Sequence, residues 1–222
     1  MEIAIAGGHG QIARRLTRIL VARGDRVRGL IRNPDHAEDL RADGAEPVVC
    51  DLEHAAAPEV AGAIAGADAV VFAAGAGPGS GAERKATMDR DGAVLLLEAA
   101  RAANVAQYVM VSAIGAADPP AGDDVFGVYL RAKADADRAV IASDRDWSVL
   151  RPGALTNEPG DGRVTIQQTP LYGEVSRDNV AAAVAAVLQR PDTHRAVLYL
   201  IDGDSEISAA LDAAAAEQPR GR

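Results

Sequence analysis

Seven short apolar runs recur along the chain, each four to six residues long and rich in Val, Ile or Leu. They span residues 3–6, 26–31, 47–50, 69–74, 108–111, 147–150 and 197–201. Apolar and polar residues hardly alternate within them, which is typical of strands buried on both faces of a parallel sheet. We therefore expect a parallel sheet of about seven strands.

Segments with an apolar period near 3.6 residues lie between these runs. Residues 12–20, 94–103, 130–141 and 180–188 are predicted helices on this basis. Strands and helices thus alternate along the chain, which predicts a doubly wound α/β fold. Nothing in the composition marks a linker or an internal repeat, so we expect residues 1–222 to form a single domain.

Charge and cysteine content exclude several functional classes. The chain has 32 acidic and 23 basic residues and a net charge of −9, so we expect no nucleic-acid partner. Cys50 is the only cysteine, which excludes an internal disulfide, and we expect no metal. The chain shows no signal-peptide pattern and no stretch of about 18 apolar residues, so we expect a cytoplasmic protein with no membrane partner. Among the basic residues, 21 are Arg and only Lys85 and Lys133 are Lys.

A glycine-rich turn follows the first predicted strand. It reads Gly7-Gly8-His9-Gly10-Gln11-Ile12-Ala13. Gly7 suits a tight turn because it has no Cβ, and Gly10 lets the backbone approach a pyrophosphate at the start of a helix. We predict that a dinucleotide contacts Gly7, Gly10, Gln11 and Ile12, whereas His9 either adds a contact or is simply exposed. The alternative is an ordinary glycine-rich turn between a strand and a helix.

The end of the second predicted strand bears on the choice of dinucleotide. A site for NAD usually carries Asp or Glu there to bind the ribose 2′-hydroxyl, but this strand ends at Arg32 and Asn33. The guanidinium of Arg32 can hold a 2′-phosphate through two hydrogen bonds. The sequence therefore favours NADP(H) over NAD(H), unless Arg32 is only a surface residue at the start of a loop.

Two further strand ends supply candidate cofactor contacts. After the third strand, Asp51 is placed to accept from the adenine amino group, or alternatively to cap the next segment, and Leu52 is placed to pack on the ring. After the fourth strand come three small residues that let the cofactor pass close to the strand end, namely Ala73, Ala74 and Gly75. Residues 76–81 then form either a cover over the site or a plain loop.

The candidate catalytic residues are Tyr129, Lys133 and Ser112. Tyr129 and Lys133 are four residues apart in a predicted helix and therefore share one face. An ammonium group next to a phenol lowers the phenol pKa, and Lys133 can also hold the nicotinamide ribose. Ser112 follows the fifth strand, where its hydroxyl can orient a substrate carbonyl. A turn after the sixth strand is expected to face the nicotinamide, and it contains Pro152, Gly153, Ala154 and Leu155.

Together these motifs resemble the short-chain dehydrogenase/reductase superfamily. The resemblance covers nearly the whole chain and is strongest for the atypical branch of single-domain NAD(P)H-binding proteins, which includes NmrA-like, biliverdin reductase B-like and sugar epimerase-like members. It rests on residues 7–13, 32–34, 51–52, 73–75, 111–112, 150–153 and 176–181, and on Tyr129 with Lys133. The resemblance implies a Rossmann-like sheet of about seven strands with bound NADP(H).

The resemblance leaves more than one function open. We expect an NADPH-dependent oxidoreductase that reduces a small carbonyl, quinone or flavin-like acceptor. The first alternative is a non-catalytic NADP(H)-binding redox sensor, and the second is a nucleotide-sugar epimerase or dehydratase. We expect a monomer or homodimer with a small substrate region near residues 154–175. The predicted acceptor walls are three loops at residues 75–81, 119–126 and 157–172.

Overall fold

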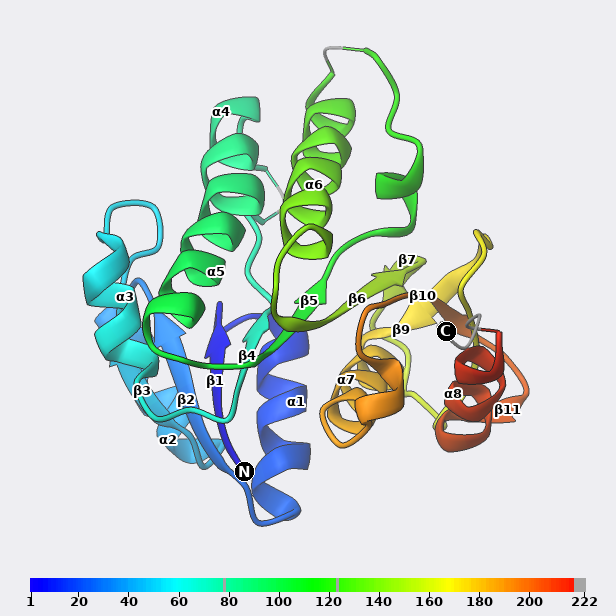
Figure 1. The fold of residues 1–222 in the computed structure, drawn as a ribbon, viewed down its shortest axis with the longest axis horizontal. Helices are drawn as coiled ribbons and strands as arrows, with labels where there is room; N and C mark the ends of the chain where they lie inside the picture. The colour runs from blue at the N-terminus through cyan, green and yellow to red at the C-terminus, as the bar shows by residue number, and fades with distance from the viewer. Residues whose placement is uncertain (78, 123, 218–222) are drawn as a thin grey trace.

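The computed structural model of the protein describes residues 1–77, 79–122 and 124–217 (Figure 1). A nine-stranded sheet forms the centre of the fold, and seven of its strands are parallel neighbours. In sheet order these seven are β3 (Glu46–Val49), β2 (Arg26–Ile31), β1 (Glu2–Ala6), β4 (Ala69–Phe72), β5 (Gln107–Val111), β6 (Asp146–Pro152) and β10 (Ala196–Asp202). They coincide with the seven apolar runs, so the predicted doubly wound, Rossmann-like α/β fold is confirmed.

Helices cover both faces of the sheet. One face packs against α1 (Gln11–Ala22), α2 (Ala37–Ala42), α7 (Arg177–Val187) and α8 (Ile207–Ala216). The other face packs against α3 (Ala57–Ile64), α5 (Ala93–Ala102) and α6 (Val125–Ile141). Successive strand residues point to opposite faces of the sheet. Ile3 and Ile5 of β1 pack in the core under α1 and α7, and Ala4 and Ala6 pack in the core under α3 and α5.

Shorter helical elements complete the connections. They are α4 (Ala82–Arg84), the 3₁₀ helices η1 (Pro34–His36), η3 (Ile114–Ala117) and η4 (Pro191–Thr193), and the π-helical segment η2 (Lys85–Gly92). The π-helical segment runs directly from α4 into α5, and wider turns of this kind are frequent at functional sites. Within the described residues, no helix is both long and apolar enough to cross a membrane.

The strand order predicts a functional site at the carboxyl ends of the central strands. The chain leaves β1 toward β2 and β3 and then crosses over to β4 on the other side of β1. Ligands of open α/β sheets bind in the crevice at the carboxyl ends of the strands where the winding direction changes. The ends of β1 and β4, marked by the paired residues Ala6 and Phe72, therefore point to the site.

The structure corrects the prediction that residues 157–172 are a loop. They contain β8 (Arg163–Gln167), which pairs antiparallel with β10 and with β11 (Ser205–Glu206). Val164 and Ile166 are buried and Thr165 is exposed, an alternation that the sequence already carried. A separate parallel pair, β7 (Ala154–Thr156) with β9 (Glu174–Ser176), flanks this region. Of the other two predicted loops, residues 119–126 extend into α6, and residues 78 and 123 lie outside the described residues.

Close contact between two glycines brings the first turn against β2. The backbone N–H of Gly8 donates to the carbonyl of Leu30 at 2.9 Å. A Cβ on Gly8 would lie 2.7 Å from Cα of Gly29, which is a backbone atom in the sheet. The turn can therefore lie flat on β2 only because Gly8 lacks a side chain.

We expect Gly8→Ala to lower the free energy of unfolding by about 2 kcal/mol, because the backbone of Gly29 cannot move aside for the added methyl group. Gly62→Ala is the matched control, since Gly62 is exposed in α3 and nothing lies within 4 Å of its added Cβ. The control should be neutral or stabilising by up to about 1 kcal/mol. Urea denaturation of both variants measures the difference, and equal stability would contradict the close-packing argument.

Candidate functional site

A pocket of about 410 Å³ lies at the carboxyl ends of β1 to β4. It gathers many of the predicted cofactor residues: Gly7, His9, Gly10, Arg32, Asn33, Asp51, Leu52, Ala73, Ala74 and Gly75. These residues come from four separate strand ends that only the sheet order brings together. The pocket is large and concave enough to be a ligand site, and it lies where the fold predicts one.

The glycine turn forms one wall of this pocket. Gly7 has a φ of 78°, and a Cβ there would lie 2.6 Å from Cα of Ala74 at the end of β4. Gly10 is the N-cap of α1, with no side-chain cap and no acidic residue in the first turn. The N–H groups of that turn therefore lack the usual side-chain acceptors and suit an anionic ligand such as a pyrophosphate. On these observations the pocket fits a dinucleotide.

Several predicted cofactor residues do not line this pocket. Gln11 and Ile12 lie in the first turn of α1, and Lys133 is buried behind the pocket wall. The turn after β6 is also separate, and its residues are Pro152, Gly153, Ala154 and Leu155. Pro152 and Gly153 are buried, and Ala154 and Leu155 are exposed on β7. Their predicted contacts with a cofactor stay predictions.

The pocket also contains residues that the sequence reasoning missed. They are Leu30, Ile31, His36, Cys50, Gly77, Arg84 and Met88. Leu30, Ile31 and Cys50 could have been found, because they end two of the predicted strands. His36 stacks on His9 with ring centroids 3.7 Å apart, and the Nε2 of His9 lies 2.7 Å from Asp39. The two stacked rings line the same pocket as Arg32, and no single sequence motif predicts this stacking.

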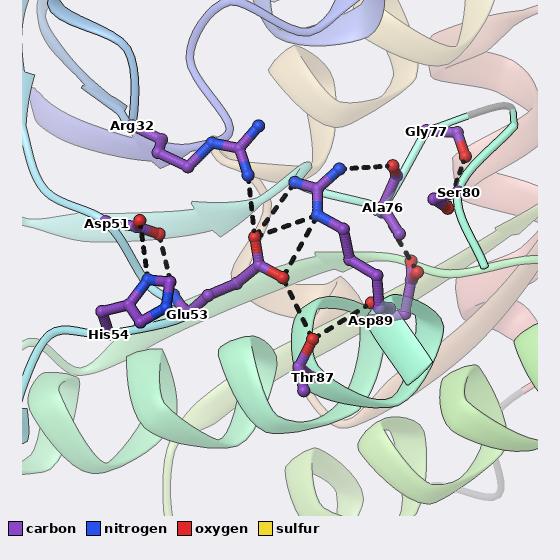
Figure 2. Close-up of polar contacts among 10 residues, drawn as sticks. Arg32, Asp51, Glu53, His54, Ala76, Gly77, Ser80, Thr87 and Asp89 are labelled. Carbon is purple, nitrogen blue, oxygen red and sulfur yellow. Dashed lines mark hydrogen bonds and ion pairs between the residues drawn. The ribbon is translucent and has the colours of Figure 1, made fainter. Parts of the chain in front are cut away.

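Arg32 is held at the pocket by a carboxylate (Figure 2). Its Nη1 donates to Glu53 at 3.0 Å, although its side chain is still 53% exposed. The Glu53 carboxylate also accepts from the Nε of Arg84, at 3.0 and 3.2 Å, and from the Thr87 hydroxyl at 3.0 Å. Glu53 would therefore keep two partners if Arg32 turned toward a ligand. Arg84 in addition donates to the carbonyl of Ala76 and so ties the loop after β4 to the same cluster.

Asp51 has two local partners as well as a place in the pocket. Its carboxylate accepts from the backbone N–H of Glu53 at 3.0 Å and lies 2.9 Å from Nδ1 of His54. Burial alone would raise the pKa of Asp51, but these hydrogen bonds outweigh it and lower the pKa below its ordinary value. The alternative interpretation of Asp51 as a capping residue is thus seen in the structure, and a contact with adenine stays a prediction.

Lys133 forms a buried ion pair. Its Nζ lies 3.2 Å from Oδ1 of Asp89, and the two side chains are only 4% and 0% exposed. The ammonium also donates to the carbonyls of Val111 and Ala74, at 3.3 and 3.5 Å, and the other Asp89 oxygen accepts from the N–H of Ala76 at 3.2 Å. The pair therefore joins α6 and the π-helical segment to the ends of β4 and β5. Asp89 was not predicted, because it lies in a polar stretch that looks like a solvated helix surface.

The phenol of Tyr129 lies beside this pair. Lys133 Nζ is 6.0 Å from the centroid of the Tyr129 ring. Burial raises the pKa of Tyr129, Lys133 lowers it, and Asp89 and Asp137 raise it again, so that the pKa lies above its ordinary value. Lys133 acts in the predicted direction, but the expected net lowering of the phenol pKa is wrong because burial is the larger effect.

Ser112 is buried next to a second ion pair. It follows β5, and its backbone N–H donates to the carbonyl of Leu150 at 2.8 Å. Nε of Arg151 donates to Asp137 at 2.9 Å, and Nη1 of Arg151 donates to the Tyr199 hydroxyl at 2.6 Å. Burial raises the pKa of Asp137 despite the opposing effects of Arg151 and Ser112. Within the described part of the chain, the Ser112 hydroxyl makes no hydrogen bond of good geometry.

Comparison with known proteins agrees with this geometry. A family described as NAD(P)H-binding matches residues 7–191. YhfK of Bacillus subtilis (strain 168), named as an uncharacterised sugar epimerase, is 35% identical over 212 residues, with 95% of this chain and 99% of the relative covered. A ceramide reductase of Caulobacter vibrioides is 33% identical over 163 residues, which cover 72% of this chain and 47% of that protein.

A solved structure shows the same fold over the whole length. It comes from Bacillus halodurans and bears the provisional name NAD-dependent epimerase/dehydratase. Its TM-score is 0.89 at 31% identity, with 96% of this chain and 99% of that chain covered. With the glycine turn, the pocket at the strand ends and the family match in agreement, the chain belongs to the NAD(P)H-binding family in the atypical branch of the short-chain dehydrogenases/reductases.

Proposed function

We propose that the protein is an NADPH-dependent oxidoreductase that reduces a small carbonyl, quinone or flavin-like acceptor. The proposal is carried by Tyr129 and Lys133 on one face of α6, beside the wall of the dinucleotide pocket. Lys133 Nζ lies 6.0 Å from the Tyr129 ring and 3.5 Å from the carbonyl of Ala74, which is a pocket residue. The reductase name of the Caulobacter relative supports the same reaction class.

Different residues in and next to the pocket would bind different parts of the cofactor. The first turn of α1 would bind the pyrophosphate, Leu52 would pack on the adenine, and Arg32 with Asn33 would hold the 2′-phosphate. His36 lines the same pocket. When bound, NADPH supplies the hydride that reduces the acceptor.

The residues near α6 would handle the proton. Tyr129 donates the proton of its hydroxyl to the acceptor oxygen, and Ser112 orients that oxygen. Lys133 holds a positive charge within reach of the Tyr129 ring. A buried phenol is a weak acid, and donation therefore depends on nearby positive charge to stabilise the phenolate that remains.

A non-catalytic NADP(H) sensor is the second candidate, and one specific observation favours it. The ammonium of Lys133 is already engaged by Asp89 and by the carbonyls of Val111 and Ala74. A lysine held in this way can maintain the pocket wall without taking part in a reaction. A sensor would bind NADP(H) with micromolar affinity and show no turnover with any acceptor in a panel of quinones, flavins and aldehydes.

We expect Arg32→Ala to weaken NADPH binding about 10- to 100-fold, since the 2′-phosphate loses a charge-assisted contact. NADH has no such phosphate, and its affinity should change by no more than about threefold on the same grounds. Arg41→Ala is the control, because Arg41 is exposed on α2, outside the pocket, and pairs with Glu38. Isothermal titration calorimetry measures all the affinities. An equal loss of affinity for NADPH and NADH would show that Arg32 does not bind the 2′-phosphate.

We expect Tyr129→Phe to lower kcat about 10²- to 10³-fold without changing NADPH affinity, because it removes the proton donor and leaves the pocket intact. Tyr108→Phe serves as the control, since the Tyr108 hydroxyl lies in the core, where it donates to the carbonyl of Ala93, and Tyr108 does not line the pocket. Steady-state oxidation of NADPH with the best acceptor of the panel measures both variants. Full turnover by Tyr129→Phe would refute the proton role and favour a mechanism like that of the flavin reductases.

A further inference from the structure

The only two lysines of the chain lie against the same tyrosine ring. Lys133 Nζ is 6.0 Å from the centroid of the Tyr129 ring, and Lys85 Nζ is 5.1 Å from it. Lys85 opens the π-helical segment, 48 positions before Lys133, and no sequence motif connects it with Tyr129. The fold therefore brings the two ammonium groups to one phenol from different elements.

The two ammonium groups differ in what compensates their charge. Lys133 is paired with Asp89, and both side chains are almost fully buried. Lys85 donates to the carbonyl of Gly77 at 2.9 Å, and no carboxylate pairs with it among the described residues. At Tyr129 the effect of Lys133 is opposed in part by Asp89, whereas the charge of Lys85 has no paired carboxylate among the described residues.

The loop after β4 holds Lys85 in place. Gly77 lines the dinucleotide pocket and has a φ of 78°, which favours glycine. Its carbonyl accepts from Lys85 and also from the Ser80 hydroxyl, each at 2.9 Å. Lys85 thus links a wall of the cofactor pocket to the Tyr129 ring.

We propose that Lys85 is a positioning residue for proton donation by Tyr129: its ammonium, held by the Gly77 carbonyl, stabilises the phenolate left when the proton has moved to the acceptor. This inference rests on the proposed reductase function. In the step, the O–H bond of Tyr129 breaks and an O–H bond forms on the acceptor oxygen, while the electron pair stays on the phenolate next to Lys85. The hydride of NADPH balances the reduction.

Physical reasoning sets the size and sign of the effect. A cation over an aromatic ring attracts the neutral phenol weakly and the phenolate strongly, because the negative charge of the phenolate spreads into the ring. At 5.1 Å from the ring centroid, Lys85 would therefore favour the ionised form of Tyr129. When one such charge is removed from a partly exposed position next to a phenol, the midpoint of the phenol titration rises by about one pH unit.

The test is a spectroscopic titration of Tyr129, which needs no acceptor. Ultraviolet difference spectra follow phenolate formation, and subtracting the same titration of a Tyr129→Phe background isolates this residue. Lys85→Gln keeps a donor for Gly77 and loses the charge, Lys85→Arg keeps the charge, and Ser80→Ala removes only the neutral contact with Gly77. Circular dichroism verifies that each variant stays folded over the titration.

We expect the Tyr129 midpoint to rise by about one pH unit in Lys85→Gln and to stay within about 0.3 units of the parent protein in Lys85→Arg and Ser80→Ala. With the best acceptor, kcat of Lys85→Gln at neutral pH should fall about tenfold. An unchanged midpoint in Lys85→Gln overturns the proposal, and so does an equal rise in Ser80→Ala, which would show that loop anchoring is responsible. Failure of the reductase function itself is recognised separately, by the absence of turnover in the parent protein with every acceptor of the panel.

Discussion

The buried ion pair of Lys133 and Asp89 is the interaction on which the site depends. Two opposite charges with almost no exposure to water carry a large desolvation cost, which matched donors and acceptors offset in part. Within the described residues, Asp89 Oδ1 faces the Lys133 ammonium at 3.2 Å but makes no hydrogen bond of good geometry. The matching groups are the carbonyls of Val111 and Ala74 and the N–H of Ala76. Each of these backbone groups lies at or just after a strand end. The pair can form only when β4, β5, α6 and the π-helical segment have reached their final arrangement.

This pair also determines how charge is distributed around the pocket. Burial of Tyr129, with a smaller contribution from Asp89, outweighs the effect of Lys133, so the phenol pKa stays above its ordinary value. A second ammonium near the Tyr129 ring is that of Lys85, which the loop after β4 holds through Gly77. The same loop is tied to Glu53 through Arg84, which donates to the carbonyl of Ala76. The Arg84–Glu53 cluster and the Lys85–Tyr129 contact are thus linked through one loop.

Most of the fold could be predicted from the sequence because it depends on local patterns, namely apolar runs and turn residues. Seven apolar runs became the seven parallel strands, and Gly7 has the left-handed φ that its turn requires. The alternation at Val164 and Ile166 was an available signal for β8 that we did not use. The burial of Asp89 could not be predicted in this way, because it depends on the π-helical segment and on pairing with Lys133, which is 44 residues away. Non-local pairings of this sort cannot be inferred from composition or periodicity.

The chain has two lysines among 23 basic residues, and the structure gives a physical reason for Lys at one of them, position 133. At position 133 the ammonium has three acceptors, from Asp89, Val111 and Ala74. A guanidinium has five donors in a rigid plane, so Arg there would leave donors unsatisfied in a buried site. Position 85 is partly exposed, and its one partner is a backbone carbonyl that Arg can also reach. Hydrogen bonding therefore explains Lys rather than Arg at position 133, whereas at position 85 Arg could supply the same proposed charge beside Tyr129.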